Sequence, residues 1–156
     1  MPAKSIPTIP FTAAAYAQNQ AEYERLRKLR VEVMERLKTA REMGDLSENG
    51  AYKYAKFELG DIGRRMRQLK HLLINGYIAQ SDPTITTASF GKTVRLKHNA
   101  TEFTFLLVSE HESDMSHNKL SINSPIGKAI AGKKAGEQVA VTTPRGEAIY
   151  TILEVS

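Results

Sequence analysis

The sequence predicts an α+β protein, in which an N-terminal antiparallel coiled-coil hairpin precedes a small antiparallel α+β domain. Two observations lead to this prediction. The first half contains two long runs with apolar residues at heptad spacing and no proline between Pro10 and Pro83. The second half contains short runs with strand-like alternation between turn residues. We therefore expect the hairpin in residues 1–80 and the second domain in residues 81–156.

The heptad pattern is clearest in the second predicted helix, which begins near Asn49. Apolar residues follow one another there at spacings of three and four over three heptads: Tyr52, Ala55, Leu59, Ile62, Met66, Leu69 and Leu73. This spacing is typical of the a and d positions of a coiled coil. It predicts that the helix packs along its length against a second helix.

The first predicted helix has a broader and less regular apolar face. Thr12 is its predicted N-cap, and the residues up to Pro10 are expected to form a loose tail. One apolar seam contains Tyr16, Tyr23, Leu26, Val33, Leu37 and Ala40. Two polar residues, Asn19 and Arg30, also fall on this seam. Leu29 adds a second apolar stripe beside it. Each helix of about 30 residues is about 45 Å long. The turn between two such helices cannot be buried in their own core.

The predicted turn, residues 44–49, has the sequence Gly-Asp-Leu-Ser-Glu-Asn and places two carboxylates three residues apart. One interpretation is structural: Asp45 is an N-cap, Glu48 is the N3 residue of a capping box, and Gly44 ends the first helix. The other interpretation is functional: Asp45 and Glu48 form an acidic tip that a long rod presents to a partner. The spacing alone leaves both interpretations open.

Charge and composition narrow the classes of function. Residues 1–80 contain 14 Lys and Arg against 9 Asp and Glu, whereas residues 81–156 contain 8 of each sign. A basic hairpin suits a polyanion or an acidic channel, although a solvated helix surface explains the same charges. The chain has no cysteine, which excludes disulfides, cysteine zinc sites and thiol nucleophiles. No run suits a signal peptide or a membrane span, so we expect a cytoplasmic protein without membrane contact.

The second half is predicted to hold four strands and one short helix. The strands are expected at residues 92–97, 102–109, 137–142 and 148–155, after a polar linker at residues 81–89. Ser124 is a predicted N-cap with Pro125 at N1, and Gly132 is expected to close the helix over residues 125–131.

Two motifs in this half suggest chemistry that the residues do not support. The stretch from Gly127 to Lys134 is similar to a phosphate-binding loop. However, Lys134 stands where that motif requires Ser or Thr to reach the magnesium ion. Its first glycine also lies inside the predicted helix rather than after a strand. His111 and His117 flank Asp114, but no further ligands stand at metal-binding spacing.

Three motifs follow one another along the chain: residues 40–52 (AREMGDLSENGAY), 124–136 (SPIGKAIAGKKAG) and 143–147 (TPRGE). Through these motifs the chain resembles, over nearly its whole length, the Gre family of transcript-cleavage factors. It implies a coiled-coil hairpin and an FKBP-like C-terminal domain that bind bacterial RNA polymerase at its secondary channel. It also implies a monomeric accessory factor, not itself an enzyme, that stimulates the polymerase's own cleavage of backtracked nascent RNA.

The same resemblance implies roles for residues near the tip. Asp45 and Glu48 match the family's carboxylates that act at the polymerase active centre, where they share Mg²⁺ with the polymerase. The free protein is then expected to hold no metal stably, because two exposed carboxylates do not complete a magnesium site. Arg41 and Lys56 match a basic surface that meets the 3′ segment of the nascent RNA. Lys53 shares a helix face with Lys56 because the two stand three positions apart.

In the second half, the resemblance implies that Ser124, Pro125, Ile126 and Gly127 belong to a polymerase-binding segment. Three alternatives stay open. The first alternative is a related protein that occupies the channel and inhibits or modulates polymerase without cleavage. It is suggested by Ala51, which stands where the family commonly has Glu. The FKBP-like architecture alone suggests a prolyl isomerase or chaperone, and the basic rod alone suggests non-specific binding of nucleic acid, DNA included.

Overall fold

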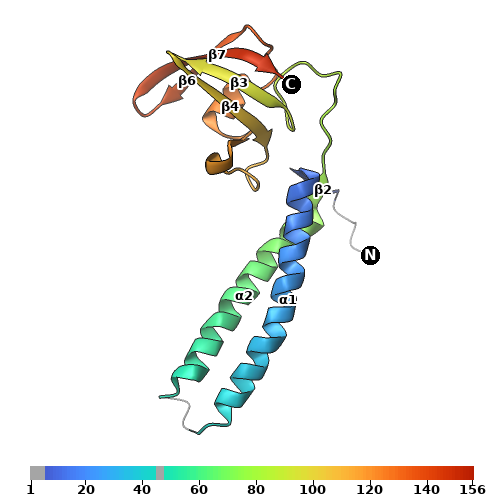
Figure 1. The fold of residues 1–156 in the computed structure, drawn as a ribbon, viewed down its shortest axis with the longest axis vertical. Helices are drawn as coiled ribbons and strands as arrows, with labels where there is room; N and C mark the ends of the chain where they lie inside the picture. Colours follow the sequence, from blue (N-terminus) through green and yellow to red (C-terminus); the bar gives the residue numbers. More distant parts are fainter. Residues whose placement is uncertain (1–5, 45–47) are drawn as a thin grey trace. The chain divides into compact units, whose positions relative to one another are not determined.

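A computed structural model describes residues 6–44 and 48–156. The contacts between residues divide the chain into two compact units. One consists mainly of residues Tyr16–Gly76, and the other combines Ile9–Ala15 with Tyr77–Ser156. Figure 1 labels the main helices and strands along the chain.

The first unit is the helical hairpin that the heptad spacing predicts. Helix α1 (Ala13–Arg41) and helix α2 (Gly50–Asn75) contain 29 and 26 residues and lie side by side (Figure 1). The centre of their interface consists of Leu26, Val33, Ala55, Ile62 and Leu69, flanked by Tyr23, Leu29, Leu37, Leu59 and Met66. Arg30, which the seam also predicted at the interface, is exposed instead, because the neighbouring Leu29 packs there.

Polar contacts between the two helices add to the alignment that the apolar interface fixes. Arg65 donates two hydrogen bonds to the Glu22 carboxylate, at 2.7 and 2.8 Å, which lowers the pKa of Glu22 and raises the pKa of Arg65. Arg36 and Glu58 form an ion pair in which Arg36 Nη2 lies 3.0 Å from Glu58 Oε2. Because these side chains are partly exposed, each pair contributes at most about 1 kcal/mol, but an offset of the helices would break both. Within residues 6–44 and 48–156, no helix has both the length and the apolar character needed to cross a membrane.

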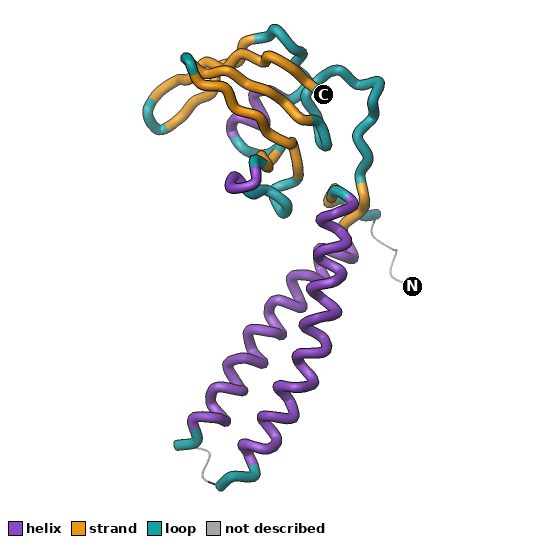
Figure 2. The backbone as a smooth tube through the Cα atoms, viewed as in Figure 1, coloured by secondary structure: helices purple, strands orange, loops and turns teal. Residues whose placement is uncertain are grey.

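The second unit is built on a five-stranded sheet with the order β5-β4-β3-β7-β6. Its strands are β3 (Thr93–His98), β4 (Thr101–Val108), β5 (Lys119–Ser121), β6 (Gln138–Thr143) and β7 (Gly146–Val155). Figure 2 shows them in orange. The four predicted strands are present to within two residues at each end. All pairs are antiparallel except β4 with β5, which are parallel.

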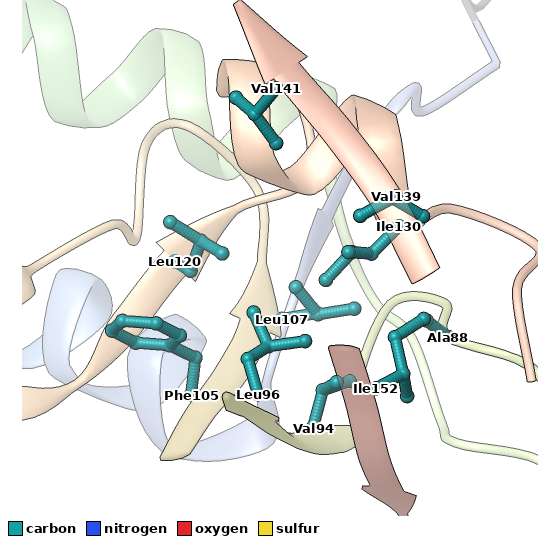
Figure 3. Close-up of a cluster of buried hydrophobic side chains, with 10 residues drawn as sticks. All are labelled: Ala88, Val94, Leu96, Phe105, Leu107, Leu120, Ile130, Val139, Val141 and Ile152. Atoms are coloured by element: carbon teal, nitrogen blue, oxygen red, sulfur yellow. The ribbon is translucent and has the colours of Figure 1, made fainter. Parts of the chain in front are cut away.

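Side chains from the sheet and one helix form the core of this unit (Figure 3). Helix α3 (Pro125–Ile130) contributes Ile130, which is fully buried. The ten core residues are Ala88, Val94, Leu96, Phe105, Leu107, Leu120, Ile130, Val139, Val141 and Ile152. The alternation at Val94/Leu96 and Val139/Val141 therefore indicated the buried face of β3 and β6 correctly.

The stretch predicted as a polar linker is bound to the second unit. The backbone N–H of Ala88 donates to Lys133 O and its carbonyl accepts from Gly132 N–H, both at 2.9 Å, and its side chain is buried. The buried Lys92 donates from Nζ to the carbonyl of Asp82 at 2.7 Å. Residues 81–86 are exposed and lie outside the helices and strands, as expected of a polar linker. The burial of Ala88 was not predicted, because polar composition does not reveal hydrogen bonds to a distant turn.

The residues before helix α1 are also more ordered than the sequence predicted. Strand β1 (Ile9–Phe11) pairs with strand β2 (Gly76–Ile78), and Phe11 is buried, so Ile9 and Pro10 are not part of a loose tail. Thr12 is the N-cap as predicted, because its Oγ1 accepts from Ala15 N–H. Its own N–H and hydroxyl donate to the Glu112 carboxylate at 2.9 and 2.8 Å, a contact that the sequence did not indicate.

Candidate functional site

Asn49 holds the two helix ends at the tip of the hairpin. Its Oδ1 accepts a hydrogen bond from Tyr52 N–H at 3.1 Å, as an N-cap does for the first turn of α2. Its Nδ2 donates to the carbonyl of Ala40, in the last turn of α1, at 2.7 Å. On the α1 side, Gly44 has a φ of 111°, a left-handed conformation that favours glycine. The Ala40 carbonyl also accepts from Met43 N–H at 3.2 Å, so the Asn49 amide adds a second bond there while it satisfies a donor in the first turn of α2.

This geometry overturns the capping-box interpretation of the acidic pair. Helix α2 begins at Gly50 with Asn49 as its cap, so Glu48 precedes the helix instead of lying at its third position. An amide can accept from α2 and donate to α1, whereas a carboxylate can only accept. Asp45 lies outside the described residues.

The Glu48 carboxylate is available to an external partner. Glu48 is exposed, and it makes no hydrogen bond or ion pair with any residue of 6–44 or 48–156. Its backbone position is nevertheless fixed, because the neighbouring Asn49 is bonded to both helices. Glu48 is thus an exposed carboxylate on an anchored backbone, without a partner among residues 6–44 and 48–156.

Arg41 and Lys56, from different helices, come together at one aromatic ring. The Arg41 guanidinium carbon lies 5.9 Å from the centroid of the Tyr52 ring, and Lys56 Nζ lies 5.5 Å from it. Both distances are within the range of cation–π attraction. Tyr52 is half-buried in the seam, so it orients two exposed cations close to the tip. The sequence predicted the two cations, but not the ring between them.

Lys53 lies at a separate, shallow depression of about 500 Å³ on α2. Its lining residues are Lys53, Lys56, Phe57, Gly60 and Arg64. None of these described residues carries a negative charge. Lys56 therefore belongs both to this depression and to the cluster at Tyr52.

A larger groove of about 600 Å³ runs between the two helices. Its basic residues are Arg30, Lys38, Arg41, Arg64 and Arg67, against one carboxylate, Glu35. Its apolar and small lining residues are Met34, Leu37, Leu59, Gly60 and Gly63. The heptad pattern places these cations at scattered positions, and only the packing of the helices collects them along one groove.

In the second unit, the segment 124–127 opens helix α3. Ser124 is the N-cap as predicted: its Oγ accepts from Gly127 N–H at 3.0 Å and donates to Ser121 O at 2.6 Å. A Cβ on Gly127 would lie 2.2 Å from Ser121 O, so only glycine fits there. Ile126 packs against the core, whereas Pro125 is exposed. Pro125 is therefore the member of this segment that a partner can reach most easily.

Within residues 6–44 and 48–156, no three His, Asp or Glu side chains are grouped to hold a metal ion. His117 Nδ1 lies 2.6 Å from Asp114 Oδ2, and the Ser116 hydroxyl and His117 together lower the pKa of Asp114 to about 2. Glu48 fits Mg²⁺ only as a contributed ligand, because magnesium is usually held by one or two carboxylates together with water and substrate phosphate.

Comparison with known proteins covers both units. Residues 9–78 match the family model described as "Transcription elongation factor, N-terminal". Residues 82–156 match the model described as "Transcription elongation factor, GreA/GreB, C-term". Together the two models span nearly the whole chain.

Individual relatives agree with the family models over the same length. The chain is 38% identical to transcription elongation factor GreA of Thermosipho africanus, over 95% of this chain and 96% of that protein. It is 37% identical to the GreA factor of Bacillus subtilis, over 94% and 96% of the two chains. Among solved structures, GreA factor homolog 1 of Thermus thermophilus aligns over 95% of this chain and 98% of its own, with 24% identity and a TM-score of 0.45. The two family models and the full-length relatives show that this chain belongs to the GreA/GreB family of transcription elongation factors.

Proposed function

We propose that this protein binds bacterial RNA polymerase through its secondary channel and stimulates the polymerase's own cleavage of backtracked nascent RNA, which rescues arrested complexes. The observation that carries this proposal is Glu48, an exposed carboxylate without a described partner, anchored at the end of a long helical hairpin. A carboxylate in this position has no structural use in the described chain. Membership of the elongation-factor family supplies the target.

In this mechanism the hairpin tip donates ligands and the polymerase remains the enzyme. Asp45 and Glu48 would contribute carboxylate oxygens to Mg²⁺ shared with the polymerase, and the ion would supply Lewis acidity and an activated water at the phosphodiester. Asn49 limits the movement of Glu48 by fixing the adjacent backbone to both helices. Such preorganisation reduces the ordering that must accompany the reaction.

The basic residues near the tip hold the extruded 3′ segment of the RNA. Lys53 and Lys56 lie in about the first two turns of α2, and Arg41, the last residue of α1, shares the Tyr52 ring with Lys56. Single-stranded nucleic acid is held by cations along its phosphates and by aromatic rings against its bases. The position of these cations supports a role in guiding RNA toward the carboxylates.

The second unit supplies the specific attachment to the polymerase. Residues 81–156 contain 8 basic and 8 acidic residues, so this unit has no net charge that would attract it to nucleic acid over a long range. A specific contact with a protein surface is therefore the better explanation of its role. Ser124, Pro125, Ile126 and Gly127 form the contact segment, with Pro125 on its surface. We propose that the protein acts as a cytoplasmic monomer bound to one polymerase.

A second candidate function is inhibition of polymerase by occupation of the channel without cleavage. It is favoured by the first turn of α2, which contains no acidic residue and begins with Gly50 and Ala51. Fewer carboxylates near the tip would weaken its interaction with a metal. Both candidates share the same polymerase contact and differ only in what the tip does.

One experiment separates the two functions. Purified polymerase is stalled on a template so that a labelled RNA is backtracked by a defined length, and the shortening of that RNA is followed with and without the protein. Stimulated release of a short 3′ fragment, followed by restart of elongation, is the expected result. Binding to polymerase with suppressed elongation and no fragment would favour the inhibitor and contradict the cleavage proposal.

A further inference from the structure

Phe57 places a phenyl ring on the solvent side of helix α2. The ring is 75% exposed, whereas the seam residues Ala55 and Ile62 of the same helix are buried. It therefore adds nothing to the packing of the hairpin. A single exposed apolar residue is common on protein surfaces, so the surroundings of Phe57 decide whether it has a role.

The surroundings of Phe57 are basic and spatially open. Lys53, Lys56 and Arg64 line the same depression of about 500 Å³, together with Gly60. Lys53 and Gly60 stand four residues before and three residues after Phe57, on the same helix face. The ring therefore lies among three cations without an acidic residue among those lining the depression.

Gly60 keeps the space beside the ring free. A Cβ at this position would meet only Arg64 Nη1, at 3.7 Å, so packing does not require a glycine there. Its φ is not in the left-handed region, so backbone conformation does not require one either. A glycine inside a helix costs about 1 kcal/mol relative to alanine. A flat group stacked on Phe57 would benefit from this missing side chain.

We propose that Phe57 is a stacking platform for one base of single-stranded RNA, and that Lys53, Lys56 and Arg64 hold the flanking phosphates. An aromatic face among cations is the combination that single-stranded nucleic acid requires, because every base has a flat face and every linkage a negative charge. This inference rests on the proposed function, since the RNA is the extruded 3′ segment. Phe57 lies seven residues after Gly50, the first residue of α2, which is about 10 Å along the helix.

The test measures stacking directly and separately from cleavage. Backtracked complexes are prepared with 2-aminopurine, a base whose fluorescence is quenched by stacking, at successive positions of the extruded RNA. Full-length protein carrying Glu48→Gln is added, so that the RNA stays intact while it is bound. We expect protein-dependent quenching at one position. Phe57→Ala should abolish it and Phe57→Tyr should retain it.

Two further variants control the interpretation. Ile74→Ala removes another exposed apolar side chain of α2, 56% exposed and far from the tip, and should leave the quenching unchanged. Phe57→Leu keeps an apolar side chain without an aromatic face and should lose it. In otherwise unchanged protein, Phe57→Ala should lower cleavage of deeply backtracked RNA at least about fivefold, as expected for one lost stacked base.

Equal quenching by wild-type and Phe57→Ala protein at every position would overturn the proposal. So would an equal loss of affinity for polymerase that carries no extruded RNA, because the ring would then contact the wall of the channel. Failure of the proposed function has a different signature: the unsubstituted protein would not stimulate cleavage at all. Quenching dependent on Phe57 in that case would still establish the base contact.

Discussion

At the scale of single residues, the tip depends on the difference between an amide and a carboxylate. Asn49 both accepts from Tyr52 N–H and donates to Ala40 O, so it can join two helix ends that one carboxylate could not. Glu48, one residue earlier, is left without a described partner. Structural and chemical roles are thus divided between two neighbouring residues.

The carboxylates should be required for chemistry but not for attachment. Because Glu48 makes no described contact within the chain, Glu48→Gln should fold normally and bind polymerase within about twofold of wild type. Asp45→Asn is expected to behave in the same way. Each change should lower stimulated cleavage at least about tenfold, a barrier increase of about 1.4 kcal/mol. Competition binding and cleavage are measured on the same preparations, and wild-type cleavage by both variants would contradict the catalytic role of the tip.

Asn49 should be required for stability and for the position of the tip. Asn49→Ala removes a helix cap and the bond to Ala40, and should lower the free energy of unfolding by about 1–2 kcal/mol in urea titrations. Asn49→Asp keeps the acceptor for Tyr52 but cannot donate to Ala40. This matched variant should recover most of the capping stability, while cleavage stays below wild type. Full recovery of cleavage by Asn49→Asp would show that the bond to Ala40 does not position Glu48.

At the scale of elements, the α1–α2 pair turns a scattered set of cations into continuous basic surfaces. The buried seam fixes the alignment, and the Glu22–Arg65 pair adds to it while Glu22 is ionised. Because the pKa of Glu22 is lowered in the folded protein, its contribution is complete above the ordinary carboxyl value of 4.5 and is lost as the pH falls through the lowered pKa. The alignment brings Arg41 and Lys56 to the same ring.

Reversing the charges of Lys53 and Lys56 should weaken cleavage more for deeply backtracked RNA than for short excursions. A longer extruded segment offers more phosphates to these cations, so the Lys53→Glu/Lys56→Glu variant loses more. The difference from wild type should shrink as salt is raised, because screening weakens the contact in both. The control is Lys28→Glu/Lys70→Glu, an equal charge change at exposed hairpin positions remote from Glu48 in sequence. An equal effect of both double variants at all backtrack lengths would indicate only a general charge effect.

At the scale of the whole molecule, the two units differ in charge and in the kind of surface they present. The hairpin carries the entire charge excess, whereas the second unit has a balanced charge and a compact apolar core. This difference agrees with the proposed roles of the two units, in which the basic hairpin approaches RNA and the second unit recognises the polymerase. The residues Ile9–Ala15 group with the second unit by their contacts, so a fragment that begins at residue 81 omits part of it.

Shortening the hairpin should therefore separate cleavage from binding. Deleting residues 24–30 and 60–66 removes one heptad, about 10 Å, from each arm and keeps the a/d spacing on both sides. The shortened protein should bind polymerase within about threefold of wild type, because its second unit is complete. It should not stimulate cleavage, because the carboxylates no longer reach the reacting phosphodiester. Circular dichroism and thermal melting verify the fold, and normal cleavage by a folded shortened protein would contradict a mechanism that depends on reach.

The hairpin, the strands β3, β4, β6 and β7, and the Ser124 cap could be predicted from the sequence, because each depends on periodicity or on side-chain-to-backbone bonds within a few residues. The start of α2 near Asn49 was also predicted, and Asn49 is its N-cap. The bond from Asn49 Nδ2 to the carbonyl of Ala40 could not be predicted, because only the packing of the two helices provides that acceptor. The same limit explains the short parallel strand β5 and the linker bound to Gly132, which depend on partners far along the chain.

In the candidate site, too, some features could be predicted from the sequence and others depend on tertiary structure. Asp45, Glu48, Arg41 and Lys56 were identified from a local motif, since a family signature is read along the chain. Their arrangement was decided by tertiary structure: the Tyr52 ring between two cations belongs to the packed seam, and the groove of arginines exists only where α1 lies against α2. The residue types at the tip are a property of the sequence. The distances among them arise from the hydrophobic interface between α1 and α2, without which those side chains would not meet.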